Sequence, residues 1–156
     1  LQILELLRSL QSQTGLSLLL ITHDLGVVSE IADEVYVMYA GRIVEHASTA
    51  AILAGPRHPY TQALLRCTPR LALRTDRLEV IPGSVPSRGR HPSGCRFHPR
   101  CSLTRERAAD GARERSEVSG HGVLRRCVEL FAGEASGTPA MHEVAPGHFV
   151  ACWEVD

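Results

Sequence analysis

Two sets of side chains in this sequence have the chemistry of a functional site. The first is His23, which follows the apolar run Leu18–Ile21 and precedes Asp24. Such a run is typical of a buried strand in a parallel sheet, and the carboxyl ends of these strands face the crevice where ligands bind. An imidazole placed there could contact a phosphate or a reacting water. The alternative is structural: His23 only hydrogen-bonds at the start of the next helix, with Asp24 as its N-cap.

The second set is cysteine. The chain has five, of which Cys95, Cys101, Cys127 and Cys152 lie in its second half. An odd number with uneven spacing argues against a disulfide framework and favours free thiols or a metal centre. Zinc ligands usually stand about two to four residues apart, whereas iron–sulfur ligation tolerates the wider gap between Cys95 and Cys101. These residues alone leave a cluster, a zinc ion and no metal all open. Cys67 ends an expected helix and is interpreted as an ordinary buried thiol.

Length and charge limit the classes of function. The chain has 156 residues with 17 basic and 17 acidic side chains, so its overall charge does not favour nucleic acid or an anionic membrane surface. Its longest apolar run is too short to span a bilayer, and its first residues lack the pattern of a secretion signal. Arg88, Arg90, Arg96 and Arg100 could form a basic patch, but only Phe97 is interleaved for base stacking, so nucleic acid is not an expected partner.

The first part of the chain, residues 1–69, is expected to alternate helices and strands around His23. The expected elements are a helix Leu1–Gln13, the buried strand Leu16–Thr22, a helix Leu25–Ala32, a hairpin of Glu34–Tyr39 with Arg42–His46, a helix capped by Ser48 and ending at Gly55-Pro56, and a helix from His58-Pro59-Tyr60 to Thr68-Pro69. Helical spacing of apolar residues predicts the helices, and alternation around Ala40-Gly41 predicts the hairpin. His58 and Tyr60 are interpreted as structural residues of a helix start.

The composition changes in the second part, residues 70–156. Proline and glycine are frequent over Pro82–Pro99, which excludes regular helix and favours a looping segment. The insert Arg105–Val118 alternates charges without an apolar stripe, and Gly133–Gly137 is small and polar, so both are expected to be solvated excursions. A segment so poor in apolar residues buries a small core, which a metal or a cross-link would stabilise.

Several segments resemble the ATPase subunits of ABC transporters. They are L-L-L-I-T-H-D-L at Leu18–Leu25, A-D-E-V-Y-V-M-Y-A-G-R-I-V-E at Ala32–Glu45 and H-P-Y-T-Q-A-L-L at His58–Leu65. The last of these, with I-P-G-S-V-P at Ile81–Pro86 and G-C-R-F-H-P-R-C at Gly94–Cys101, is similar to the oligopeptide and dipeptide importer branch. The resemblance implies an α/β fold: the C-terminal part of a P-loop ABC nucleotide-binding domain, then a small irregular cysteine-containing domain.

The resemblance also implies a function, an ATP-hydrolysing energy-coupling subunit of an ABC importer for peptides. ATP and magnesium are the implied cofactors, and His23 would contact the γ-phosphate. Cys95, Cys101, Cys127 and Cys152 would hold a [4Fe-4S] cluster, with zinc as the alternative. The implied partners are a second ABC ATPase subunit in a homo- or heterodimer, transmembrane permease subunits and, indirectly, a peptide-binding protein. The protein would be peripheral, at the cytoplasmic face of the plasma membrane.

Other parts of that family's pattern are absent from the printed sequence. It has no G-x-x-x-x-G-K-[ST] phosphate loop, no L-S-G-G-Q-like signature and no apolar strand ending in Asp-Glu. Because the chain begins at Leu1 inside a helical pattern, these parts are expected upstream, and this chain alone is expected to be inactive. The family's third cysteine follows soon after the second, so here the insert Ser102–Arg126 would have to loop out to return Cys127. A non-catalytic metal-binding interaction module is the alternative function.

Overall fold

The computed structural model describes residues 2–68, 80–87, 89–111, 114–118, 120–128 and 137–155. Helices and strands are mixed, in keeping with the expected α/β class. In chain order the elements are α1 (Gln2–Thr14), α2 (Leu25–Ile31), β1 (Glu34–Tyr39), β2 (Arg42–Ser48), α3 (Thr49–Ala54), α4 (Pro59–Arg66), the 3-10 helix η1 (His98–Arg100), α5 (Ser102–Ala109), β3 (Arg115–Val118), β4 (His121–Leu124), α6 (Arg125–Val128), β5 (His142–Ala145) and β6 (His148–Val150). The expected boundary between the two parts of the chain, at residues 69 and 70, lies outside the described residues. Residues 133–136 of the expected solvated segment Gly133–Gly137 also lie outside them.

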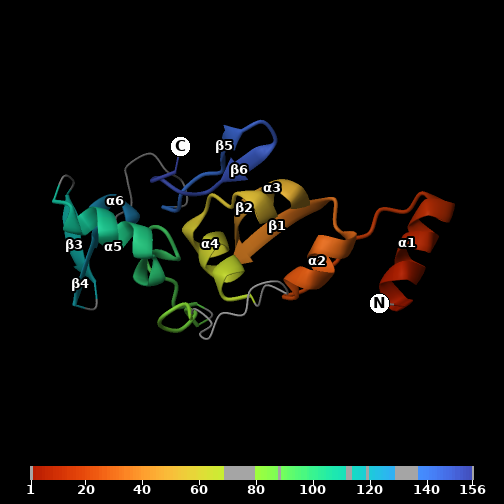
Figure 1. Cartoon of the computed structure of the whole chain (residues 1–156). Coiled ribbons are helices and arrows are strands. Elements are labelled where there is room, and N and C mark those ends of the chain that lie inside the picture. Colours follow the sequence, from red (N-terminus) through yellow and green to blue (C-terminus); the bar gives the residue numbers. More distant parts are fainter. Residues whose placement is uncertain are drawn as a thin grey trace.

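The centre of the molecule is a four-stranded sheet in the order β1-β2-β6-β5, and each neighbouring pair in it is antiparallel (Figure 1). β1 and β2 form the predicted hairpin, with Tyr39 opposite Arg42. Ala40 and Gly41 between them have positive φ angles of 47° and 80°, the conformation that a tight two-residue hairpin turn needs. The predicted hairpin is therefore confirmed.

The other two strands of this sheet come from the end of the chain. β6 pairs with β2 through Glu45 with Val150 and His46 with Phe149. Neither β5 nor β6 was predicted from the sequence. Because of this pairing, the parts of the chain before and after the expected boundary share one sheet.

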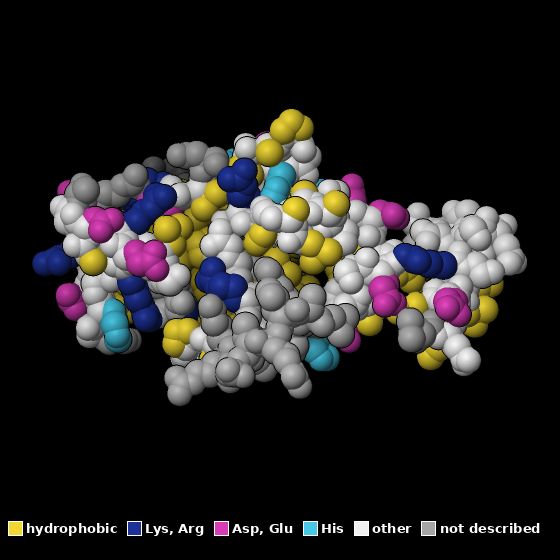
Figure 2. All heavy atoms as spheres, viewed as in Figure 1, with side chains coloured by type: hydrophobic (Ala, Val, Ile, Leu, Met, Phe, Trp, Pro, Cys, Tyr) yellow, Lys and Arg dark blue, Asp and Glu magenta, His cyan; other side chains and the backbone are white. Residues whose placement is uncertain are grey.

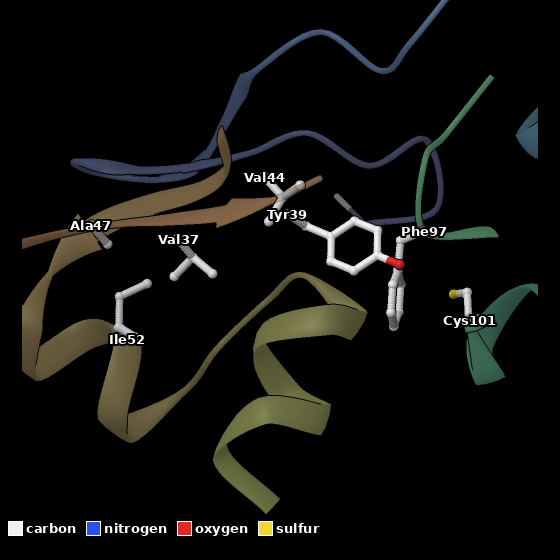
Figure 3. Packing of buried hydrophobic residues seen from close by; sticks show 7 residues of the cluster. All are labelled: Val37, Tyr39, Val44, Ala47, Ile52, Phe97 and Cys101. Atoms are coloured by element: carbon white, nitrogen blue, oxygen red, sulfur yellow. The ribbon is translucent and has the colours of Figure 1, made fainter. Parts of the chain in front are cut away.

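The main core packs against this sheet. Its buried members are Val37, Tyr39, Val44, Ala47, Ile52, Phe97 and Cys101 (Figure 3). Ile52 belongs to α3, which the side chain of Ser48 caps as predicted. Phe97 lies between Tyr39 and Cys101 in Figure 3, and its ring meets Tyr39 edge-on with 5.1 Å between ring centres. This aromatic contact joins the hairpin to the cysteine-bearing segment.

The expected buried strand Leu16–Thr22 is wrong, because the structure has no strand there. Leu19 and Ile21 are 86% and 91% exposed. A parallel strand is stable between other strands with helices over both faces, and no described strand of this chain pairs with the run. The helices on either side, α1 and α2, are confirmed, but α1 stands away from the sheet (Figure 1) and hydrophobic side chains lie on the surface at that end (Figure 2). No helix in the described part of the chain is long and apolar enough to cross a membrane.

The insert before Cys127 is more regular than predicted. It contains α5 and the antiparallel pair β3–β4, and Ala108 packs with Leu124 and Cys127 in a second small core. Thr104 and Ala108 are buried and four residues apart, so they lie on one face of α5. Most described residues of Arg105–Val118 are exposed, in keeping with a solvated segment, and Ala108 is the buried one among them. Its regular structure was not predicted, because so few inward-facing residues leave no visible apolar stripe.

The looping segment before η1 has no helix or strand in its described residues, as predicted. Two of the arginines considered as a basic patch hold it in place. Arg100 donates to the carbonyl oxygens of Pro82 at 2.8 Å and Ile81 at 3.0 Å, and Arg96 donates to the carbonyl oxygen of Ala40. These bonds attach the segment to itself and to the hairpin turn.

Replacing Ile52 with Ala should lower the free energy of unfolding by about 2–5 kcal/mol, because Ile52 is 2% exposed and its loss leaves a cavity under the sheet. Urea unfolding of the purified chain measures the effect. The matched control is Leu53→Ala on the same helix, since Leu53 is 39% exposed and its truncation should cost about 0.5 kcal/mol or less. Equal losses in the two variants would contradict this core.

Candidate functional site

The four cysteines that the sequence analysis grouped together line one small cavity, here called the thiol cavity. Other walls come from the start of α4 and from the residues after β6. The space open to the centre of a water molecule is about 10 Å³, which is room for about one water. Cys67 lies outside the cavity, at the C-cap of α4.

A close backbone approach brings Cys127 back to Cys95 across the insert. The N–H of Cys95 donates to the carbonyl oxygen of Cys127 at 3.0 Å. The preceding Gly94 has a φ of +68°, and a Cβ at this position would lie 2.5 Å from that same oxygen. Glycine therefore fits both the conformation and the space. Cys101 at the start of α5 and Cys152 after β6 complete the set.

Burial raises the pKa of all four thiols, and neighbouring thiols raise it further for Cys95, Cys101 and Cys152. Burial is the largest cause for each, and the neighbouring Cys101, Cys127 and Cys152 raise the pKa of Cys95 further. The pKa of Cys101 is raised to about 12 and that of Cys152 to about 11. In the absence of a cation these groups are therefore neutral thiols, and binding of a metal ion would release their protons.

Nearby polar groups nevertheless oppose part of this rise in pKa. The pKa is lowered by the backbone of Phe97 for Cys95, by the backbone of Thr104 and Leu103 for Cys101, and by the side chain of Thr104 for Cys127. For Cys152 the group is the backbone N–H of Glu154, which donates a hydrogen bond to the sulfur. The Glu154 bond has a nitrogen–sulfur distance of 3.4 Å. Each group lowers the pKa of its thiol, because it stabilises the thiolate that coordinates metals.

These thiols fit a metal centre in number and kind, as four free cysteines around one space. The sulfurs are not arranged as ligands of a single ion: within the described ranges, no group of three or more His, Cys, Asp and Glu side chains could hold a metal.

A buried carboxylate fixes the loop beside the thiol cavity. Glu45 of β2 is fully buried, and its Oε2 accepts the N–H of His58 at 3.0 Å. Its Oε1 accepts the N–H of Arg57 and lies 2.7 Å from Nε2 of His148. Burying a carboxylate is costly unless donors surround it, and these groups meet that need. This site could not be predicted from the sequence, since no periodicity relates Glu45 and His148, which are 103 positions apart.

His58 caps α4, as predicted from its position before Pro59. Its Nδ1 accepts the N–H of Tyr60 at 3.0 Å. The residue is 1% exposed, and burial lowers the pKa of its imidazole to about 3, so the ring is neutral. The other nitrogen, Nε2, is buried without a partner in the described part of the chain, and His58 lines the thiol cavity. The predicted structural role accounts for only one of the two nitrogens.

His23 is exposed, in the turn between the apolar run and α2. The structural alternative named Asp24 as the helix cap, and the Oδ1 of Asp24 does accept the N–H of Gly26 at 2.8 Å and that of Val27 at 3.3 Å. The imidazole takes no part in this cap. His23 is not among the residues of the thiol cavity, so the two sets of side chains are separate sites.

Comparison with known proteins shows which protein family the chain resembles. Residues 44–107 match the family described as oligopeptide/dipeptide transporter, C-terminal region. The resemblance found in the sequence is confirmed.

Two relatives give the match more detail. A putative peptide import ATP-binding protein of Brucella ovis is 51% identical over 111 residues, which cover 67% of this chain and 33% of the relative. The dipeptide transport ATP-binding protein DppD of Escherichia coli is 49% identical over 106 residues, which cover 68% of this chain and 32% of the relative. The chain thus spans about one third of the length of these relatives.

Replacing His58 with Asn should weaken the loss of stability in mild acid. The folded imidazole stays neutral down to about pH 3, whereas an unfolded histidine binds a proton near 6.5. The unfolded state therefore binds more protons in this window, and the free energy of unfolding falls as the pH decreases, by up to about 1.4 kcal/mol per unit. Asn can cap through Oδ1 and does not titrate.

Urea unfolding at a series of pH values between about 6 and 4 measures this slope. The matched control is His91→Asn, which removes an exposed histidine. Parallel slopes for His58→Asn and the unmodified chain would contradict a buried neutral imidazole.

Proposed function

We propose that this chain is part of an ATP-hydrolysing, energy-coupling subunit of an ABC importer for peptides. The observation that carries the proposal is the family match over residues 44–107 together with about 50% identity to peptide-import ATP-binding proteins. ATP and magnesium are the proposed cofactors of the whole protein. Its proposed partners are a second ATPase subunit, permease subunits and, indirectly, a peptide-binding protein, at the cytoplasmic face of the plasma membrane.

The reading frame upstream of the Leu1 codon tests this proposal directly. It should encode a phosphate loop, whose backbone N–H groups and lysine hold the β and γ phosphates, and the signature motif. A frame that lacks both would favour the non-catalytic metal-binding module instead.

His23 is proposed to contact the γ-phosphate of ATP in the whole protein. Its imidazole is exposed and is not used by the cap of α2, so it is accessible to a ligand. The exposed run Leu18–Ile21 supports the same proposal, because additional strands of a longer protein would pair with it and hold His23 at the edge of a parallel sheet.

Replacing His23 with Ala in the whole ATP-binding subunit, assembled with its permeases, should lower ATP turnover about a hundredfold or more, because it removes a contact to the transferred phosphoryl group. Binding of ATP should change much less. Steady-state phosphate release and nucleotide titration measure the two quantities, with His91→Ala as the control. Turnover equal to that of the unmodified protein would mean that the imidazole is structural.

Cys95, Cys101, Cys127 and Cys152 are proposed to hold one [4Fe-4S] cluster, with zinc as the alternative. The support is the shared thiol cavity and the wide spacing of the first two cysteines. A bound cluster would supply a cross-link between η1, α6 and the residues after β6. The contacts already present between these parts include the bond from the N–H of Cys95 to the carbonyl oxygen of Cys127 and the small core of Ala108, Leu124, Cys127 and the partly buried Trp153.

Anaerobic purification of the chain should give a brown protein with about four irons per chain. Replacing any of the four proposed ligands with Ser should bleach the colour, while Cys67→Ser, the matched control, should keep it. Metal analysis and visible absorption measure the outcome. One zinc in a colourless protein would favour the alternative, and freely titrating thiols with neither metal would contradict the centre.

A further inference from the structure

His58 lines the thiol cavity and holds a buried hydrogen-bond donor. A neutral imidazole has one donor and one acceptor nitrogen, and Nδ1 is the acceptor because it receives the N–H of Tyr60 at 3.0 Å. The proton is therefore on Nε2. This nitrogen has no partner in the ranges that the structure covers, and the thiol sulfurs around the cavity do not serve as acceptors for it. Unpaired buried donors are rare because they are costly, so this one requires an explanation.

The ring has little freedom to find another acceptor. The backbone N–H of His58 is bound to Glu45 Oε2 at 3.0 Å, and the side chain is bound to the N–H of Tyr60. Phe97 packs beside the ring with 6.0 Å between ring centres. Rotation of the imidazole would break the helix cap, so the orientation of the Nε2–H group is fixed.

We propose that Nε2–H of His58 donates a hydrogen bond to a sulfur atom of the metal centre in the thiol cavity, either a bridging sulfide or a cysteine thiolate. The inference rests on the proposed cluster. His58 is a positioning residue and not a ligand, because a ligating nitrogen needs a free lone pair and the proton occupies Nε2 while Nδ1 caps α4. The donor favours the more negative, reduced cluster and thereby raises its reduction potential.

Two substitutions separate the donor from the cap. His58→Asn keeps an acceptor near the position of Nδ1 and removes the Nε2 donor. His58→Gln keeps an N–H donor at similar reach and removes the near acceptor. Spectroelectrochemical titration of the iron-loaded chain measures the reduction potential. In His58→Asn the ratio of reduced to oxidised cluster at a fixed potential should fall about tenfold, which is about 59 mV for one electron. In His58→Gln the potential should stay close to that of the unmodified chain.

The outcomes distinguish this inference from the proposed cluster. Full iron content with an unchanged potential in His58→Asn overturns the role of His58 and leaves the cluster in place. An unmodified chain without iron overturns both. If neither variant folds, pulsed electron paramagnetic resonance on the reduced, unmodified chain with isotopically labelled histidine decides: a coupled histidine nitrogen and an exchangeable proton support the bond, and their absence overturns it.

Discussion

The buried carboxylate of Glu45 is the interaction on which the rest of this structure depends. It binds the backbone N–H groups of Arg57 and His58 and the imidazole of His148, so β2, the loop before α4 and β6 meet at one side chain. Because an unpartnered carboxylate is costly to bury, none of these elements can move away alone. The attachment of the last strands to the hairpin and the position of His58 beside the thiol cavity both depend on it.

The elements around the thiol cavity are held by ordinary contacts as well as by any metal. Glu154 has a side chain only 1% exposed and forms ion pairs with Arg107 at 2.5 Å and Arg126 at 2.9 Å, and Gly94 admits the close approach of Cys127. A metal centre would therefore complete an existing arrangement, in contrast to small domains that are unfolded without their ion. The cysteine set could be predicted because residue type alone marks it. Residue type does not indicate, in contrast, that the second nitrogen of the helix-capping His58 is buried without a partner in the described part of the chain.

Elements specified by neighbouring residues could be predicted from the sequence, whereas elements that depend on residues far apart in the chain could not. The turn at Gly41 and the cap at Ser48 depend on neighbouring residues, and both were predicted correctly. Leu16–Thr22 is apolar enough for a buried strand, but a strand exists only with neighbours, which the sequence of the run does not contain. Ala108 faces inward from a helix with no apolar stripe, and the partners of Glu45 come from distant positions. Patterns of local periodicity do not record either arrangement.

The exposed run Leu18–Ile21 also decides how this chain behaves at high concentration. Leu19 and Ile21 are 86% and 91% exposed, and the run has neither a charge nor a proline to keep other chains from pairing with it. Unpaired apolar segments of this kind are templates for intermolecular β-sheet. Aggregation through this run, more than the free energy of folding, would then limit the concentration at which the isolated chain stays in solution. A charged substitution within the run would raise this maximum concentration.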